Sequence, residues 1–111
     1  MTDPMLENDS CLAEIVRRLV ETFQPVRIYL FGSKARGEGG PDSDYDLMVL
    51  VRDEQAPPQI RRSKKAYTAL RGTGAAADVL VWSLHSFDSR LHLAASLPAT
   101  IKREGILLYA A

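Results

Sequence analysis

The sequence lacks several features that define common classes of protein. It has one cysteine, Cys11, among 111 residues, which excludes an internal disulfide framework, and no second thiol is available for a zinc site. Fourteen acidic side chains balance fourteen basic ones, so the broad positive field of a duplex DNA-binding protein is absent and direct nucleic-acid binding is not expected. No apolar run is long enough to cross a membrane, and the polar first ten residues do not resemble a signal peptide. We therefore expect a cytoplasmic protein that makes no membrane contact.

What is present fits a single folded domain over residues 1–111. Apolar residues make up 46% of the chain, and a chain of this length lies near the common domain size. It buries roughly two-thirds of its unfolded surface, which is enough for a core without disulfides or a structural metal.

Hydrophobic periodicity predicts helices that alternate with strands. Strands are expected at residues 26–31, 44–51, 77–82 and 106–109. Helices are expected at residues 6–23, 60–70 and 84–104, the last interrupted at Pro98 and capped by Gly105. This alternation predicts an α/β fold with one mixed β-sheet flanked by helices.

Three carboxylates fall within otherwise hydrophobic strands. Asp44 and Asp46 are two residues apart, which places both on one face of their strand, and Asp78 stands near the start of another. Aspartate is depleted in strands, and two carboxylates at this distance repel each other unless a cation lies between them. A divalent metal relieves that repulsion most simply. The alternative is a solvated strand end at Asp44 and Asp46 with Asp78 as a strand cap.

A glycine turn follows the first predicted strand. Gly32 allows a tight turn and the close approach of a phosphate, and the Ser33 hydroxyl can donate to a phosphate oxygen. Lys34 and Arg36 add positive charge beside it. Taken alone, Gly-Ser after a strand is also an ordinary turn. The sequence has neither the Gly-Lys-Ser/Thr of a P-loop nor the glycine spacing of a dinucleotide-binding loop.

These two segments together resemble the nucleotidyltransferase superfamily of the DNA polymerase beta type. The signature of that superfamily is Gly-Ser, ten residues, then Asp-x-Asp, and here residues 34–43 separate Ser33 from Asp44. The closest resemblance is to the minimal nucleotidyltransferases, single-domain proteins of about this size, whose chain endings are also similar to residues 103–109. The resemblance thus extends from the first helix to the last strand.

The resemblance implies a role for each motif residue. Gly32 and Ser33 would hold the β- and γ-phosphates of ATP, with Arg36 close by. Asp44 and Asp46 would bind two Mg²⁺ ions, and Asp78 would be the third carboxylate, binding one metal and helping to activate the attacking hydroxyl. Two metals clamp the attacking and leaving oxygens of an in-line displacement, so activity is expected to depend strictly on metal.

The resemblance also implies a biological setting. Many minimal nucleotidyltransferases are antitoxins that transfer AMP from ATP to a tyrosine of a partner ribonuclease toxin of the HEPN family. Two alternatives remain: an antitoxin that inhibits by binding and occlusion without essential catalysis, and a transferase acting on a small hydroxylated molecule such as an aminoglycoside. The complete set of carboxylates favours an enzyme, and the lack of an added acceptor domain favours an acceptor supplied by a partner protein.

Overall fold

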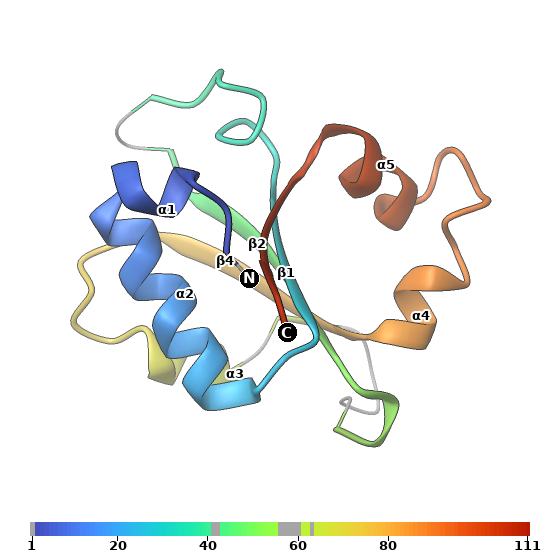
Figure 1. Cartoon of the computed structure of the whole chain (residues 1–111), viewed down its shortest axis with the longest axis horizontal. Helices are drawn as coiled ribbons and strands as arrows, with labels where there is room; N and C mark the ends of the chain where they lie inside the picture. Colours follow the sequence, from blue (N-terminus) through green and yellow to red (C-terminus); the bar gives the residue numbers. More distant parts are fainter. Residues whose placement is uncertain (1, 41–42, 56–60, 63) are drawn as a thin grey trace.

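A computed structural model describes residues 2–40, 43–55, 61–62 and 64–111 of the chain. Helices and strands alternate along it, as the sequence predicts (Figure 1). In chain order they are α1 (Met5–Asn8), α2 (Ser10–Phe23), β1 (Arg27–Phe31), β2 (Tyr45–Val51), the 3₁₀ turn η1 (Asp53–Gln55), β3 (Arg61–Arg62), α3 (Lys64–Ala69), β4 (Ala77–Ser83), α4 (Leu84–Asp88), α5 (Leu97–Glu104) and β5 (Ile106–Ala110).

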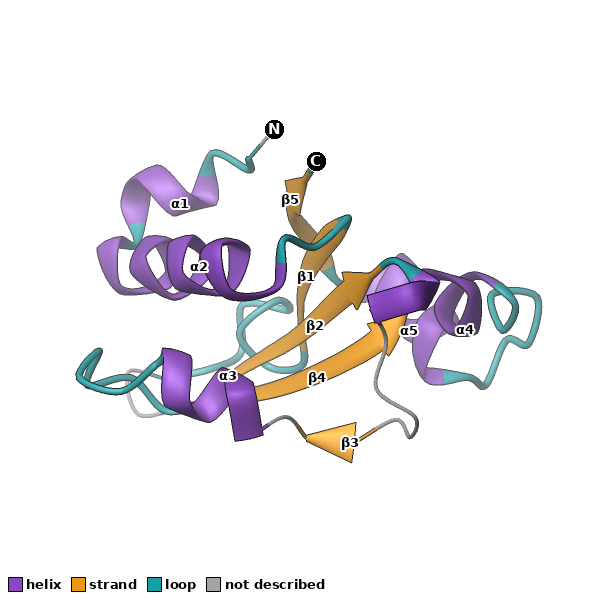
Figure 2. Cartoon of the chain, turned by 90° about the horizontal axis from the view of Figure 1, so that it is seen from below, coloured by secondary structure: helices purple, strands orange, loops and turns teal. Residues whose placement is uncertain are grey.

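The strands form one mixed β-sheet in the order β3-β4-β2-β1-β5. β1 pairs antiparallel with β2 and β5, and β3 pairs antiparallel with β4, whereas β2 and β4 run parallel. A parallel pair needs a crossover connection, and α3 lies in the one between β2 and β4 (Figure 2). The expected α/β architecture, a mixed sheet flanked by helices, is confirmed.

The central strand β2 supplies side chains to both faces of the sheet. Helices α1 to α3 cover one face, and α4 and α5 cover the other (Figure 1). Leu47, Val49 and Val51 pack into the core on the α2 side, while Met48 and Leu50 pack into the core against α4 and α5. Each buried side chain of this size contributes about 1.5–3 kcal/mol of transfer free energy. The predicted alternation is therefore correct along β2, and Asp46 near its start is carried by a strand that the core holds on both sides.

The predicted first helix over residues 6–23 is broken in two at Asp9. Asp9 has an extended backbone (φ −134°) and its Oδ1 accepts a hydrogen bond from the N–H of Leu12 at 3.0 Å, which makes it the N-cap of α2. Periodicity alone missed the break because apolar spacing continues across it. α2 ends at Phe23, before Pro25 as predicted, with Gln24 in the left-handed conformation (φ 46°).

The predicted helix over residues 60–70 is shorter than expected, since α3 begins at Lys64. Residues 60 and 63 lie outside the described part of the chain. Residues 61 and 62 form β3, whose backbone pairs with Val81 and Leu80 of β4. A strand edge presents unpaired N–H and C=O groups, and pairing them outweighs the helical pattern of this segment.

The predicted helical tail contains two short helices, with turns over residues 89–96. We expected Pro98 to interrupt a helix, and this expectation is wrong. Pro98 lies in the first turn of α5, where the N–H that proline lacks would have no partner within the helix, so its absence costs nothing. Ser96 is the N-cap there, and its hydroxyl accepts a hydrogen bond from the N–H of Ala99 at 3.2 Å. Gly105 follows the last residue of α5 as predicted. Among the described residues, no helix is long and apolar enough to span a membrane.

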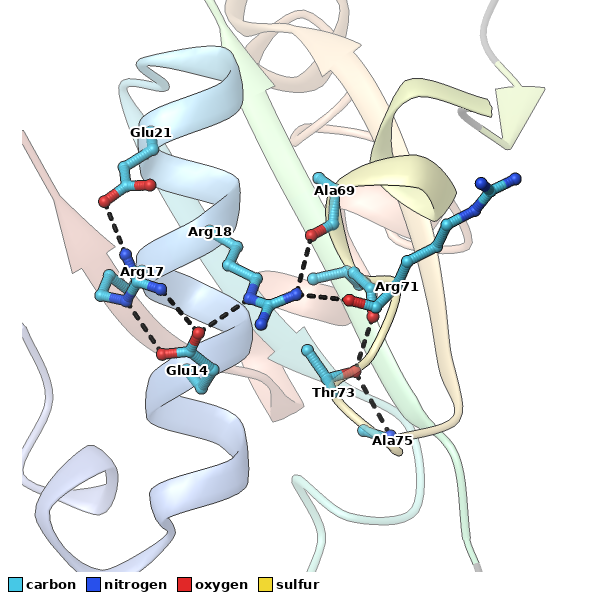
Figure 3. A network of polar contacts seen from close by, with 9 residues as sticks. Glu14, Arg17, Arg18, Glu21, Ala69, Arg71, Thr73 and Ala75 are labelled. Atoms are coloured by element: carbon cyan, nitrogen blue, oxygen red, sulfur yellow. Dashed lines mark hydrogen bonds and ion pairs between the residues drawn. The ribbon is translucent and has the colours of Figure 1, made fainter.

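A polar network on the surface of α2 fixes the end of α3 (Figure 3). Arg17 and Arg18 both bind Glu14, with nitrogen–oxygen distances of 2.6 Å and 2.7 Å. Arg18 also donates to the carbonyl oxygens of Ala69 at 3.3 Å and Arg71 at 2.6 Å. Because these carbonyls end α3 and begin the loop to β4, the network ties the crossover segment to α2.

This network predicts a pH-dependent component of stability. Hydrogen bonds from Arg17 and then Arg18 lower the pKa of Glu14 from 4.5 to about 2. A depressed carboxyl pKa stabilises the fold above the unfolded value of 4.5, and that contribution is lost as the pH falls towards 2. In urea titrations between pH 7 and pH 2, Glu14→Gln should therefore show a smaller fall in the free energy of unfolding than the wild type. Glu7→Gln, on the exposed side of α1, is the control and should follow the wild type. Equal pH dependence in all three proteins would contradict the role of the network.

Candidate active site

The Gly-Ser segment forms a tight turn directly after β1. Gly32 has φ +76°, a left-handed conformation that favours glycine. The Gly32 carbonyl accepts a hydrogen bond from the N–H of Arg36 at 3.2 Å, and the Ser33 carbonyl accepts one from Glu38 at 2.9 Å. None of the hydrogen bonds within the described residues uses the amide of Ser33 or Lys34 as a donor. Successive amides presented by such a turn form a concave binding surface for anions.

β2 brings Asp46 next to this turn and next to Asp78. Asp46 lies opposite Phe31, the last residue of β1, and in register with Asp78 of the parallel strand β4. Residues in register on neighbouring strands project from the same face of a sheet. The sheet thus assembles two of the three predicted carboxylates, both half-buried, beside the Gly-Ser turn.

The backbone of Gly32 packs closely against the Asp46 carboxylate. A Cβ built at position 32 would collide with Oδ2 of Asp46 and would lie 3.2 Å from its Cγ. The glycine is therefore required for two reasons: its positive φ, and the room that it leaves for a carboxylate.

Asp44 has a different position from Asp46 and Asp78. It is exposed and precedes the first residue of β2, so strand pairing does not fix its direction relative to Asp46. Asp44 lines a hollow of about 360 Å³ whose wall includes Tyr67 and Arg71 from the α3 segment. Of the three carboxylates, Asp44 alone is among the described residues that line this hollow.

The carboxylates fit a magnesium site that the substrate completes. Among the described residues, no group of three or more His, Cys, Asp or Glu side chains is close enough together to hold a metal ion. Mg²⁺, however, is usually held by one or two carboxylates together with waters and substrate phosphates. Asp46 and Asp78, which are in register, would supply two hard oxygen ligands to such an ion, and the adjacent turn would offer amides to phosphates.

Arg36 is influenced by the charge of Asp46, but its side chain pairs with Glu38. Its Nε is 2.8 Å from Oε2 of Glu38, and both side chains are exposed. The hydrogen bond and charge of Glu38 raise the pKa of Arg36, with smaller contributions from the charges of Glu104 and Asp46. Its guanidinium therefore remains cationic and acts electrostatically on the Asp46 side of the turn.

Sequence reasoning missed two residues that contact this region. The Tyr45 hydroxyl donates a hydrogen bond to Asp9 Oδ2 at 2.9 Å, across 36 positions of sequence. Asp9 carries a recognisable signal, since an aspartate just before the apolar-periodic residues of a helix is a typical N-cap. Nothing in the sequence indicated that Tyr45 reaches it.

Comparisons with known proteins agree with this geometry. The sequence model of a family described as "Nucleotidyltransferase domain" matches residues 12–107. The poly(A) RNA polymerase GLD2 of Xenopus tropicalis is 40% identical over 48 residues, which are 43% of this chain. The chain spans only 9% of the length of that polymerase.

Two solved structures share the fold. A candidate nucleotidyltransferase from Sulfolobus solfataricus aligns with a TM-score of 0.60 and 20% identity, over 91% of this chain and 78% of that one. A toxin-antitoxin structure with AMP-PNP aligns with a TM-score of 0.61 and 24% identity, over 89% of this chain and 73% of that one.

Proposed function

This chain belongs to the nucleotidyltransferase domain family, and we propose that it transfers AMP from ATP to a tyrosine hydroxyl of a partner HEPN ribonuclease toxin, which it thereby neutralises. The observation that carries the proposal is the register of Asp46 with Asp78 beside the Gly32 turn. Hard oxygen ligands and phosphate-binding amides then meet at one end of the sheet. We propose the cytoplasm, where ATP is available, as the place of action.

The residues divide the chemistry between them. The turn at Gly32 and Ser33 binds the β- and γ-phosphates, with Arg36 adding positive charge nearby. Asp44, Asp46 and Asp78 are the proposed ligands of two Mg²⁺ ions, which when bound stabilise the charge on the attacking and leaving oxygens. Asp78 takes the proton of the attacking hydroxyl as the tyrosine oxygen bonds to the α-phosphorus. The bond from that phosphorus to the bridging oxygen breaks, and pyrophosphate leaves.

Two observations support a protein acceptor and a nucleotide substrate. The similarly folded toxin-antitoxin structure contains AMP-PNP, an ATP analogue, together with a partner protein. The hollow beside Asp44 leaves space at this exposed carboxylate for an incoming side chain.

The proposal predicts a covalent change in the partner. We expect the protein copurified with this chain, encoded by the adjacent gene, to gain the mass of one or more adenylyl groups on incubation with ATP and Mg²⁺. Intact-mass spectrometry measures the gain, and peptide mapping should place it on a tyrosine. Omission of Mg²⁺ should prevent it. A stable complex with no mass gain would contradict the proposal and would favour inhibition by occlusion.

A further inference from the structure

A cluster of three side chains lies behind the carboxylates, on the opposite face of the sheet. Tyr45 stands between Asp44 and Asp46 in sequence, and strand alternation directs its side chain away from that of Asp46. It packs against the core on the α2 side. Its hydroxyl donates to Oδ2 of Asp9 at 2.9 Å, and Oδ1 of Asp9 accepts the N–H of Leu12. One carboxylate thus caps α2 and holds the first residue of β2.

The third member of the cluster comes from the Gly-Ser turn. Nζ of Lys34 lies 4.4 Å from the centroid of the Tyr45 ring, a distance at which a cation is attracted to an aromatic face. The same ammonium is 3.5 Å from the carbonyl oxygen of Gly40. Lys34 follows Ser33 directly, so the turn rests on the ring of Tyr45. We call Asp9, Tyr45 and Lys34 the rear cluster.

The rear cluster therefore connects the two halves of the candidate site. The Tyr45 N–H donates to the carbonyl of Ala76 at 3.0 Å, and Tyr45 is in register with Ala77, the residue before Asp78. Fixing the Tyr45 side chain also fixes the backbone from which Asp46 projects. Lys34 also holds the Gly-Ser turn against the Tyr45 ring. Tyr45 therefore contacts both the strand that carries Asp46 and the turn of the proposed phosphate site.

We propose that Asp9 and Tyr45 are positioning residues for nucleotide transfer: Asp9, acting through Tyr45, sets the relative placement of the Asp46 carboxylate and the Gly32-Ser33 turn. This proposal rests on the proposed function, since it assumes that both parts bind one nucleotide and its metal. Neither residue contacts the reacting atoms. Their loss should therefore weaken metal-dependent nucleotide binding and turnover together, through geometry alone.

Two substitutions test the hydrogen bond from its two ends. Tyr45→Phe removes the hydroxyl and keeps the ring for Lys34. Asp9→Ser keeps an N-cap for α2, because serine caps about as well as aspartate, but it is too short to reach Tyr45. Tyr109→Phe, on β5 opposite Ile28 and away from the turn, is the matched control for loss of a tyrosine hydroxyl.

The measurement is calorimetric titration with AMP-PNP over a range of Mg²⁺ concentrations, alongside thermal unfolding. We expect both variants to need about tenfold more Mg²⁺ for half-maximal nucleotide binding, the size of effect expected for a lost hydrogen bond to a charged group. The double variant should be no worse than either single variant, because both remove one interaction. Tyr109→Phe should match the wild type.

A purely structural role gives a different result. If both variants unfold at lower temperature but keep the wild-type Mg²⁺ dependence of binding, the positioning proposal is overturned. This readout does not require turnover. The expected shift in binding, together with a partner whose mass never changes, would support positioning and contradict only the proposed protein adenylylation.

Discussion

Replacing Asp46 with asparagine is expected to reduce nucleotide transfer about a thousandfold while leaving the fold intact. Asparagine has the same shape but removes the negative charge from the position in register with Asp78. Electrostatic stabilisation by a bound metal supplies several kcal/mol in phosphoryl transfer, and about 4 kcal/mol corresponds to three powers of ten in rate. The rate should be measured by single-turnover transfer to the partner, with circular dichroism and thermal unfolding to check the fold.

Asp88→Asn is the matched control for this substitution. Asp88 is an exposed carboxylate at the end of α4, 3.7 Å from Arg27, and it has no place in the candidate site. The Asp88→Asn variant should transfer AMP at the wild-type rate. Transfer by Asp46→Asn at the rate of this control would show that Asp46 is not a metal ligand.

Protection from the partner toxin by an inactive Asp44→Asn, Asp46→Asn double variant would show that binding alone protects.

The local motifs were predictable because their chemistry and their spacing appear in one short stretch. Gly32-Ser33 follows a buried strand, and the alternation of β2 follows directly from its pattern of apolar residues. Asp78 was harder to place, since its approach to Asp46 requires β4 to pair with β2 in one particular register. That register is a property of the whole sheet and follows from packing on both faces.

The features that sequence reasoning missed depend on contacts between distant residues. The hydrogen bond from Tyr45 to Asp9 forms only because α2 packs across the start of β2. β3 forms because β4 would otherwise have an unpaired edge, although its two residues lie in a segment with a helical pattern. The direction of Asp44 belongs to the same class, because it precedes the paired part of β2. At β3, tertiary pairing outweighs local propensity.

The second large effect is expected at Gly32, where alanine should abolish most transfer and also destabilise the protein. Gly32 has φ +76°, and a left-handed conformation costs a residue with a Cβ about 1–2 kcal/mol. The new methyl group would also collide with Oδ2 of Asp46 and lie 3.4 Å from its Cβ. Asp46 must then turn away from Asp78, or the turn must move away from β2. Either shift separates the carboxylates from the proposed phosphate site, and we expect transfer to fall more than about a hundredfold, since displacements of about 1 Å have effects of this size.

Gly37→Ala separates the two causes of that loss. Gly37 lies at the end of the same turn with φ +74°, but a Cβ there meets nothing within 4 Å. Alanine at position 37 therefore has a similar conformational cost in its backbone, but its methyl group does not touch a carboxylate. In urea titrations, both variants should lose a similar amount of stability from the backbone, and Gly32→Ala should lose more because of its collision with Asp46. Only Gly32→Ala should lose transfer and Mg²⁺-dependent binding of AMP-PNP. Equal losses of transfer in both would mean that the turn matters through its backbone conformation alone. The close packing of Gly32 on Asp46 would then have no part in holding the nucleotide.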